Sequence, residues 1–436
     1  MRGRTDVDGY TPGHGDPSYD VSHYDLELTY KVEGNLLNGV AQLRCVALTD
    51  LDRITLDLHG LRVRKVGVDG SVVKYTHRRH QLSVRTPHTV AKGDEFEVVV
   101  QYAGHPSPTS SRALGSAGWE ELTDGAIVAG QPHGGPTWFP CNDRPDNKAG
   151  YRIALSAPST YRVVCNGDLV SATRHASTTT WVYEQTEPMA TYLATAQIGR
   201  YQLLELDAVV PLYAAVPGSL VSSYDEAFGR QPEMLELFTR LFGDYPFGRY
   251  TVVVTEDDLE IPLESQSLST FGANFMSTDW HAERLIAHEM SHQWFGNSLT
   301  LGEWRDIWLH EGFACYCEWL WSEESGKESA HERAVEHWKR LAEQEQDLVL
   351  ADPGPELMFD DRVYKRGALL LHALRLTLGD KVFFDAMQAW ATGHAHSTVS
   401  TEMFIGFVEH RTGQDLAPLF ESWLSQTALP ELPDAS

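Results

Sequence analysis

The chain has 436 residues, 42% of them hydrophobic, and it carries 35 lysines and arginines against 61 aspartates and glutamates. This length and apolar content are enough for two or three folded domains with sizeable cores. A net charge of −26 at pH 7 repels the phosphate backbone of nucleic acids, which excludes them as expected partners.

The N-terminal segment and the cysteines favour a cytoplasmic location. Arg2 and Arg4 are not followed by an apolar stretch, so the start of the chain does not resemble a secretory signal. No later segment runs long enough without charge to span a bilayer, and we expect no membrane partner. The five cysteines are odd in number and scattered, unlike a disulfide framework.

Short strands are predicted along the first two hundred residues. Apolar residues alternate in segments 24–32, 54–58 and 96–102, so that each segment, if extended, has one apolar face. Turn signals such as Asp69-Gly70 fall between these runs. We therefore predict an all-β domain over residues 1–202.

The apolar period lengthens near residues 199–202, where a second, helix-rich domain over residues 203–436 is predicted to begin. Helices are expected at 226–243, 280–296 and 305–325. A β-branched run and an extended polar segment between the first two helices indicate that this domain also contains some sheet. The predicted fold class is α+β, with no third domain.

The sequence HEMSH at residues 288–292 has the spacing of a metal site. The helix that carries it is expected to begin at one of residues 277–279. His288 and His292 lie one helical turn apart, so both imidazoles project from the same face and can bind one zinc ion. Glu289 follows the first histidine at an angle that suits a proton acceptor rather than a ligand. Two ordinary histidines on an exposed helix are the alternative.

Glu311 strengthens the zinc interpretation. Eighteen residues separate it from His292, and it lies in the next predicted helix. Two histidines and one carboxylate leave the fourth position of a zinc ion open for water, which is the catalytic rather than the structural arrangement. Zinc can lower the pKa of its water to about 7, and Glu289 can collect the proton as the water attacks a polarised carbonyl.

Four residues near Glu311 are candidates for further ligands or partners. His310 points about 100° away from Glu311 on a helix, so it is predicted not to bind the same metal. Cys315 and Cys317 face nearly opposite ways and are predicted to be small buried hydrophobes. Glu318 lies two turns after Glu311 on the same face, as either an acceptor for the second ring nitrogen of a ligating histidine or a surface carboxylate.

The sequence resembles the gluzincin aminopeptidases related to aminopeptidase N and leukotriene hydrolase. The resemblance rests on HEMSHQWFGN and WLHEGFACY, on WFPCNDRP and FGDYPFGRYTVVV, and on VYKRGALLLHALR, and it covers nearly the whole chain. It implies an N-terminal saddle-like or sandwich-like β domain followed by a thermolysin-like catalytic domain. It also implies that Tyr364 donates a hydrogen bond to the oxyanion formed at the attacked carbonyl. By position alone, this tyrosine would be assigned to the core.

The resemblance also implies two positions that bind the substrate's free ammonium group. Glu264, in the segment IPLES, keeps the anchoring carboxylate, although Pro262 has no N–H to offer a substrate. Gln131 stands where a glutamate is common, and it can accept a hydrogen bond but adds no charge. Glu260 would share a face with Glu264 in an extended segment, but an exposed loop position is the preferred interpretation.

The expected activity is that of a zinc metallo-aminopeptidase, which removes N-terminal residues from peptides through a zinc-bound water activated by Glu289. The alternatives are an endopeptidase or a non-peptide hydrolase that uses the same zinc, and a catalytically silent binding protein of the same fold. Most relatives continue into a helical C-terminal domain that roofs the active site. Without it, we expect a more open cleft that admits longer peptides.

Overall fold

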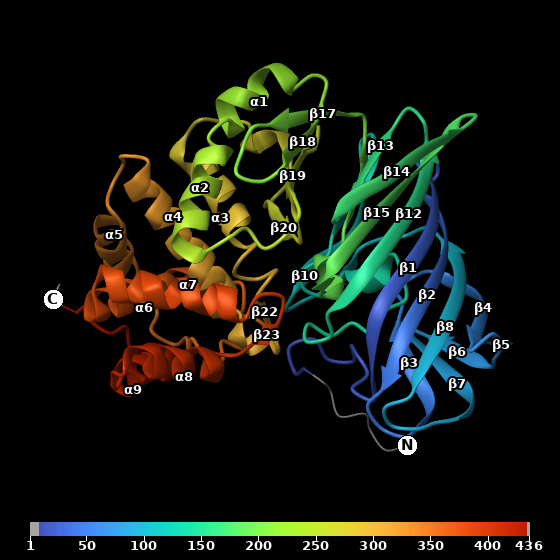
Figure 1. Cartoon of the computed structure of the whole chain (residues 1–436), viewed down its shortest axis with the longest axis horizontal. Coiled ribbons are helices and arrows are strands. Elements are labelled where there is room, and N and C mark those ends of the chain that lie inside the picture. The colour runs from blue at the N-terminus through green and yellow to red at the C-terminus, as the bar shows by residue number, and fades with distance from the viewer. Residues whose placement is uncertain (1–7, 434–436) are drawn as a thin grey trace. The chain divides into compact units, whose positions relative to one another are not determined.

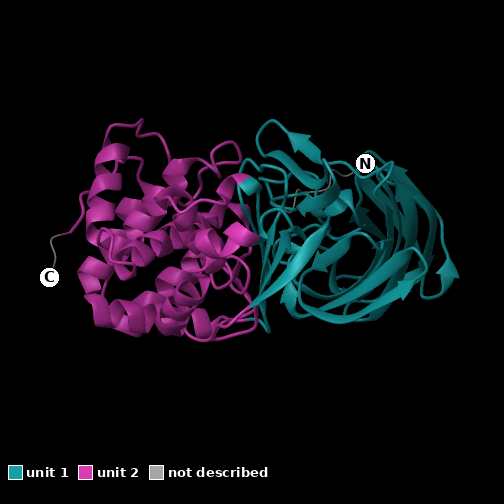
Figure 2. Ribbon diagram, turned by 90° about the horizontal axis from the view of Figure 1, so that it is seen from above, with its two compact units in different colours: residues 1–205, 213–221, 247–273 teal, residues 206–212, 222–246, 274–436 magenta. Residues whose placement is uncertain are grey.

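The computed structural model describes residues 8–433 and groups them into two compact units (Figure 2). Unit 1 contains the residues up to 205 together with 213–221 and 247–273, and unit 2 contains 206–212, 222–246 and the residues from 274 onward. The predicted boundary after residue 202 stays a prediction.

Unit 1 is built from β-sheets, whose labelled strands are shown in Figure 1. The largest has the order β14-β15-β12-β1-β2-β8-β4-β5, and two further sheets have the orders β13-β16-β11-β10-β9 and β3-β7-β6. Their strands are β1 (Tyr19–Lys31), β2 (Leu36–Ala47), β3 (Leu51–Asp57), β4 (Arg62–Val68), β5 (Ser71–Val72), β6 (Tyr75–Arg78), β7 (Gln81–Val90), β8 (Glu95–Gly104), β9 (Thr109–Ser111), β10 (Gly115–Leu122), β11 (Gly125–Ala129), β12 (Ala149–Pro158), β13 (Arg162–Cys165), β14 (Asp168–His175), β15 (Thr178–Met189) and β16 (Ala196–Gly199).

A mixed five-stranded sheet completes unit 1 and presents the segment that contains Glu264. Its order is β17-β18-β19-β21-β20, with β19 parallel to β21 and β20 antiparallel to it. Two short 3₁₀ helices, η1 (Gly135–Thr137) and η2 (Thr191–Leu193), lie in the connections of this unit. The strands of the sheet are β17 (Tyr201–Leu206), β18 (Leu212–Pro217), β19 (Tyr250–Val254), β20 (Leu263–Ser265) and β21 (Leu268–Phe271).

The alternation seen in the sequence explains why the large sheet forms. In β1, Tyr24, Leu26, Leu28 and Tyr30 are buried while the residues between them are more exposed. Burying one face of a strand contributes roughly 25 cal/mol for each Å² of apolar surface removed from water, and a one-residue slip would expose the whole set.

Unit 2 is helical. It contains α1 (Val221–Phe228, whose first residue belongs to unit 1), α2 (Gln231–Phe242), η3 (Ala273–Phe275), α3 (Trp280–Ser291), β22 (Thr300–Leu301), η4 (Trp304–Asp306), α4 (Trp308–Glu324), α5 (Ala330–Ala342), α6 (Asp361–Leu378), α7 (Asp380–Gly393), β23 (Thr398–Val399), α8 (Thr401–Thr412), α9 (Ala417–Phe420) and a π-helical turn at Glu421–Ser425. The predicted α+β class, with a β-rich N-terminal part followed by a helix-rich part, is confirmed.

The three predicted helices are all shorter in the structure than the periodicity indicated, and the one predicted at 305–325 is α4, Trp308–Glu324. The segment 226–243 is divided between α1 and α2, and the break falls at Gly229 and Arg230. A Cβ at Gly229 would lie 2.2 Å from the carbonyl oxygen of Asp225, so this position has no room for a side chain. The helix predicted at 280–296 ends at Ser291, because the residues after it form a series of turns.

The helices α4 and α6 meet through two glycines. A Cβ built on Gly312 would lie 2.8 Å from the Cα of Gly367, and one built on Gly367 would lie 2.7 Å from the Cα of Gly312. Glu311 precedes Gly312, and Tyr364 lies one turn before Gly367, so this backbone contact fixes the separation of the helices that carry both residues.

We expect Gly367→Ala to destabilise the protein by about 1–3 kcal/mol, because the added methyl group would push α4 and α6 apart. Alanine is a better helix former than glycine, so without a clash the substitution would stabilise the protein. A loss of stability therefore indicates the clash between the two helices. Thermal unfolding measures it. Gly406→Ala is the matched control: Gly406 lies within α8, and a Cβ there meets nothing within 4 Å. It should stabilise the protein by about 0.4–1 kcal/mol. Equal melting temperatures for Gly367→Ala and the parent would contradict the prediction.

Within residues 8–433, no helix combines the length and the apolar character needed for a membrane crossing.

Candidate active site

The helix α3 places the first metal-site residues. Asp279 is its N-cap, and its side chain accepts a hydrogen bond from the backbone N–H of Ala282 at 3.0 Å. This selects Asp279 among the three predicted starting positions. His288 and Glu289 lie in the last helical turn, and both are buried.

His292 is the C-cap of α3, and the turns after it hold its ring. The Nδ1 atom of His292 lies 3.0 Å from the carbonyl oxygen of Phe295. Gly296 follows with φ of 135°, a conformation that favours glycine, and the N–H of Asn297 bonds to the carbonyl oxygen of His292 at 3.0 Å. The imidazole is therefore fixed with Nδ1 as the donor and Nε2 facing the site.

Glu311 lies in the first turn of α4, where the positive end of the helix dipole favours a carboxylate. Its Oε2 atom is 3.4 Å from Nε2 of His288 and 3.5 Å from Nε2 of His292. The three ligand atoms all lie within 4.8 Å of one another, and the three residues are buried. The structure thus brings together the three residues that the sequence predicted as ligands.

Glu318 orients His288. Its Oε1 atom is 2.8 Å from Nδ1 of His288, and its Oε2 atom accepts from Nη1 of Arg284 at 3.0 Å. The prediction that Glu318 serves as an acceptor for a ligating histidine is confirmed, and the surface alternative is wrong because only 2% of Glu318 is exposed. Arg284 was missed, although it lies one helical turn before His288 and that spacing was a usable signal.

These donors fit zinc. Ligands about 2.0–2.1 Å from a tetrahedral zinc ion are roughly 3.3 Å apart, which agrees with the two separations from Glu311. Burial acts to raise the pKa of Glu311, but His292 and His288 hold the pKa well below its usual range. Glu318 is likewise held ionised, its pKa kept low by Lys365, Arg284 and His288 against the effect of burial. Two buried carboxylates therefore favour a cation here.

The neighbours predicted not to bind metal have other partners. The Nε2 atom of His310 accepts a hydrogen bond from the backbone N–H of Leu301 at 2.9 Å, so this nitrogen is occupied. Cys315 and Cys317 are buried free thiols. Burial raises the pKa of Cys315 to about 12, so this sulfur stays protonated and is a poor metal ligand.

Tyr364 lies against the metal-site residues. It is in the first turn of α6, whose N-cap is Asp360, and its ring stacks on that of His288 with centroids 6.0 Å apart and planes 18° apart. Glu289 is 4% exposed and follows His288 directly. The helices α3, α4 and α6 therefore bring a metal-binding triad, a carboxylate and a phenol together within unit 2.

Replacing Glu318 by glutamine should weaken zinc binding by about 10- to 100-fold, because His288 loses its charged acceptor and Arg284 its partner. Competition against a chromophoric chelator measures the dissociation constant directly. Glu324→Gln is the control: it lies on the same helix but forms only a surface ion pair with Arg240, at 2.8 Å. An unchanged dissociation constant in Glu318→Gln would mean that Glu318 has only a packing role.

Within unit 1, the segments that carry the two predicted amine-binding residues both contact η2. Glu264 is on β20, opposite Ser269 of β21, and is 8% exposed. The backbone N–H of Gln266 bonds to the carbonyl oxygen of Leu193 in η2 at 3.4 Å. A Cβ on Gly130, which precedes Gln131, would lie 2.2 Å from the carbonyl oxygen of Tyr192.

One end of the Gln131 side-chain amide has no partner among the described residues. Its Nε2 atom is buried and, within the described residues, has no hydrogen-bond acceptor.

Asn166 fixes the connection between β20 and β21, next to Glu264. Its Nδ2 atom donates hydrogen bonds to the carbonyl oxygens of Leu193 and Gln266 at 2.9 and 2.7 Å. Glu260 is exposed and lies before β20, as the preferred loop interpretation predicted.

Comparison with known families matches both halves of the chain. Residues 20–193 match the Peptidase M1 N-terminal domain, and residues 226–423 match the Peptidase family M1 domain. Among curated relatives, Aminopeptidase M1-B of Oryza sativa subsp. japonica is 25% identical over 93% of this chain and 50% of its own length. Leucyl aminopeptidase of Saccharolobus solfataricus is 21% identical over 94% of this chain and 54% of its own length. The chain spans about half the length of these relatives.

Solved structures match over their full length. The M1 zinc metallopeptidase from Deinococcus radiodurans is 29% identical, with a TM-score of 0.91, and the match covers 99% of this chain and 100% of that one. A variant of that enzyme bound to a Tyr-Ser-Ala substrate gives a TM-score of 0.92 with the same identity and coverage. Together with the two domain matches, these likenesses show that the chain belongs to peptidase family M1.

Proposed function

We propose that this protein is a zinc aminopeptidase that removes single residues from the N-termini of peptides. The observation that carries the proposal is the convergence of His288, His292 and Glu311, with separations of 3.4 and 3.5 Å from the Glu311 oxygen. Such a set leaves room for water at the metal, which a purely structural zinc site would not need. A silent binding protein has no use for this arrangement.

Glu289 is assigned the proton transfers. When bound at the three ligands, zinc supplies Lewis acidity that acidifies a water molecule and polarises the carbonyl to be attacked. The Glu289 carboxylate accepts the proton of the attacking water and returns it to the leaving amine. Its burial, at 4% exposure, keeps bulk water from competing for that proton.

Tyr364 is assigned to the oxyanion. Its phenol donates a hydrogen bond as negative charge develops on the carbonyl oxygen, a contribution that is larger in the transition state than in the bound peptide. The stacking of its ring on His288 supports this role, because it limits how far the hydroxyl can move.

Recognition of a free N-terminus is assigned to Glu264 and Gln131 in unit 1. A buried carboxylate binds an ammonium group by a charge-assisted hydrogen bond, and Gln131 offers a neutral acceptor through its Oε1 atom. Glu264 supports the assignment by its burial on β20, where little water can compete. The chemical step does not depend on Gln131, which adds only to binding.

The test is hydrolysis of a panel of aminoacyl fluorogenic amides beside their N-acetylated forms, with and without a metal chelator. The unblocked substrates should be cleaved, the acetylated ones should not, and the chelator should abolish turnover. Cleavage of acetylated substrates would contradict the aminopeptidase assignment, and turnover in excess chelator would contradict the zinc assignment.

Glu264→Gln separates an aminopeptidase from an endopeptidase that uses the same metal. The variant should lose on the order of tenfold or more in kcat/KM on unblocked substrates, because the ammonium group loses a charged partner. An endopeptidase would be little affected. Glu260→Gln is the matched control, since Glu260 is exposed on the same segment and should leave turnover unchanged.

We further propose a cytoplasmic location and peptides, rather than nucleic acids or membranes, as partners. The support is the net charge of −26 and the scattered cysteines, which are buried as free thiols. Cell fractionation with a tagged chain tests the location, and appearance in the medium would contradict it.

A further inference from the structure

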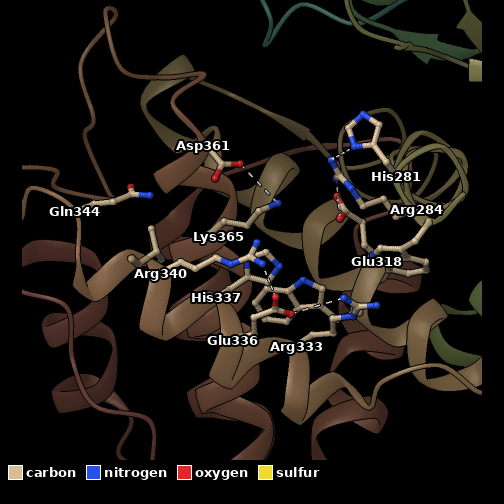
Figure 3. Close-up of a pocket in the computed structure, with 13 residues that line it drawn as sticks. His281, Arg284, Glu318, Arg333, Glu336, His337, Arg340, Gln344, Asp361 and Lys365 are labelled. Carbon is tan, nitrogen blue, oxygen red and sulfur yellow. Dashed lines mark hydrogen bonds and ion pairs between the residues drawn. The ribbon is translucent and has the colours of Figure 1, made fainter. Parts of the chain in front are cut away.

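A cavity of 390 Å³ lies next to the metal-binding residues within unit 2. The helices α3, α4, α5 and α6 form its walls, and Figure 3 shows the side chains of Arg284, His337, Arg340 and Lys365 around it. We call it the basic cavity, because Arg284, Arg333, Arg340 and Lys365 line it against the acids Glu318, Glu336 and Asp361.

The charge of the basic cavity is opposite to that of the chain. Four cationic side chains face three anionic ones, whereas the whole chain has 35 lysines and arginines against 61 acids. A ligand attracted here would therefore be anionic, although the surrounding surface repels anions.

Most of the cations are already paired. Arg284 donates to Glu318 at 3.0 Å, and Arg340 forms an ion pair with Glu336 one turn away on α5. Arg333 forms an ion pair of 2.5 Å with Glu328, so its charge is also compensated. These pairs account for the acids that face the cavity, apart from Asp361.

Lys365 is held less tightly than the other cations: in the described residues its one ion pair is a long one, with Asp361, and Glu318 attracts it electrostatically. It is 8% exposed, and its Nζ atom lies 3.3 Å from Sγ of Cys315 and 3.6 Å from Oδ1 of Asp361. The Asp361 side chain is 71% exposed, so water screens it, and the Cys315 thiol is neutral. An ammonium group has three N–H donors, and a buried charge is costly unless it is paired and hydrogen-bonded.

The basic cavity is linked to the metal-binding residues through two short connections. Glu318 bonds to His288 on one side and lines the cavity on the other. Lys365 follows Tyr364 directly on α6. A peptide that reacts beside Tyr364 could extend towards the cavity with its next residues, since each residue of an extended chain advances by about 3.3–3.6 Å.

We propose that the basic cavity binds a carboxylate of the peptide substrate through Lys365, with Arg284 and Arg340 adding positive charge. The proposal rests on the aminopeptidase function proposed above and adds a substrate class to it: peptides with a carboxylate on the leaving side. The carboxylate comes either from the C-terminus of a short peptide or from an aspartate or glutamate side chain. His337 is a neutral donor beside Lys365, because burial and the neighbouring cations lower its pKa to about 4.

The experiment compares matched peptides on the purified, zinc-loaded full chain. One arm sets Leu-Ala-Ala against its C-terminal amide, and a second arm, with every C-terminus amidated, sets Leu-Asp-Ala and Leu-Ala-Asp against their asparagine forms. We expect kcat/KM to be about tenfold higher for the carboxylate member in at least one arm. The arm that responds identifies the source of the carboxylate. The preference should weaken as salt is added.

Variants connect the preference to the cavity. Lys365→Met should bring the ratio of kcat/KM for the carboxylate peptide to kcat/KM for its neutral counterpart close to one. Lys365→Arg should keep most of the preference, because the positive charge is retained. Lys339→Met is the matched control: Lys339 is an exposed lysine on α5 outside the cavity lining, and its loss should leave the ratio unchanged.

The possible failures can be told apart. If no peptide with a free N-terminus is cleaved, whether its C-terminus is free or amidated, the aminopeptidase function is wrong. If such peptides are cleaved and the wild-type protein shows no preference in either arm, or if a folded Lys365→Met keeps it, the carboxylate site is wrong. Should Lys365→Met fail to fold, Arg340→Gln decides, with about a twofold fall in the ratio expected and an unchanged ratio overturning the proposal.

Discussion

Replacing Glu289 by glutamine should lower kcat on the order of 10³-fold while the protein still binds zinc. The glutamine side chain is the same size and remains in the last turn of α3, but it cannot accept the proton of the attacking water. The ligands are His288, His292 and Glu311, so the metal site keeps its full donor set. Turnover of an aminoacyl amide and zinc content per chain are the two measurements.

Glu283→Gln is the control for this substitution. Glu283 is a buried glutamate on the same helix, but it forms ion pairs with Arg230 at 3.0 Å and with Lys327 at 3.1 Å. Its replacement should lower stability and leave kcat near that of the parent. If Glu289→Gln kept kcat within tenfold, another base would have to be sought. If it lost zinc, Glu289 would be part of the metal site.

Tyr364→Phe should reduce kcat/KM by about 10²- to 10³-fold with little change in zinc content. Phenylalanine keeps the ring that stacks on His288, so the packing of α6 should persist. Only the hydroxyl is removed, and with it the hydrogen bond to the developing negative charge. Because this bond is stronger in the transition state than in the bound substrate, the loss should appear in kcat more than in KM.

Tyr316→Phe provides a matched comparison. Tyr316 is a buried tyrosine on α4, and its hydroxyl interacts with Nδ1 of His372 at 3.2 Å, away from the ligands. Loss of this hydroxyl should change stability by about 1 kcal/mol without a large change in kcat/KM. Equal effects of the two substitutions would show that Tyr364 acts only through packing.

The metal-binding set could be predicted from the sequence because the chemistry limits the choices. His288 and His292 are one turn apart on a helix, and this geometry follows from their spacing alone. Glu311 is farther along, yet zinc needs a third donor and α4 is predicted strongly enough to present one in its first turn. Strand β1 could also be predicted, because its apolar residues alternate with polar ones and the apolar face is buried in the structure.

Features that depend on contacts between distant segments could not be predicted. The basic cavity is one example: Lys365 lies within the recognised segment VYKRGALLLHALR, but its contacts with the Cys315 thiol and, at 3.6 Å, with Asp361 depend on where α4 and α6 place these residues. The pairing of Gly312 with Gly367 is another, because each glycine alone looks unfavourable in a helix. Periodicity carries no information about such crossings.

The close crossing of α4 and α6 has a consequence for engineering the substrate range. Glu311 and Tyr364 sit beside a contact that leaves no room for a methyl group, so libraries that vary residues at this crossing would mostly return inactive proteins. Arg340 on α5 and Gln344 just after it line the cavity without touching that contact, and both are exposed. Selection for new peptide preferences should therefore draw its successful substitutions from α5, while the two glycines stay unchanged.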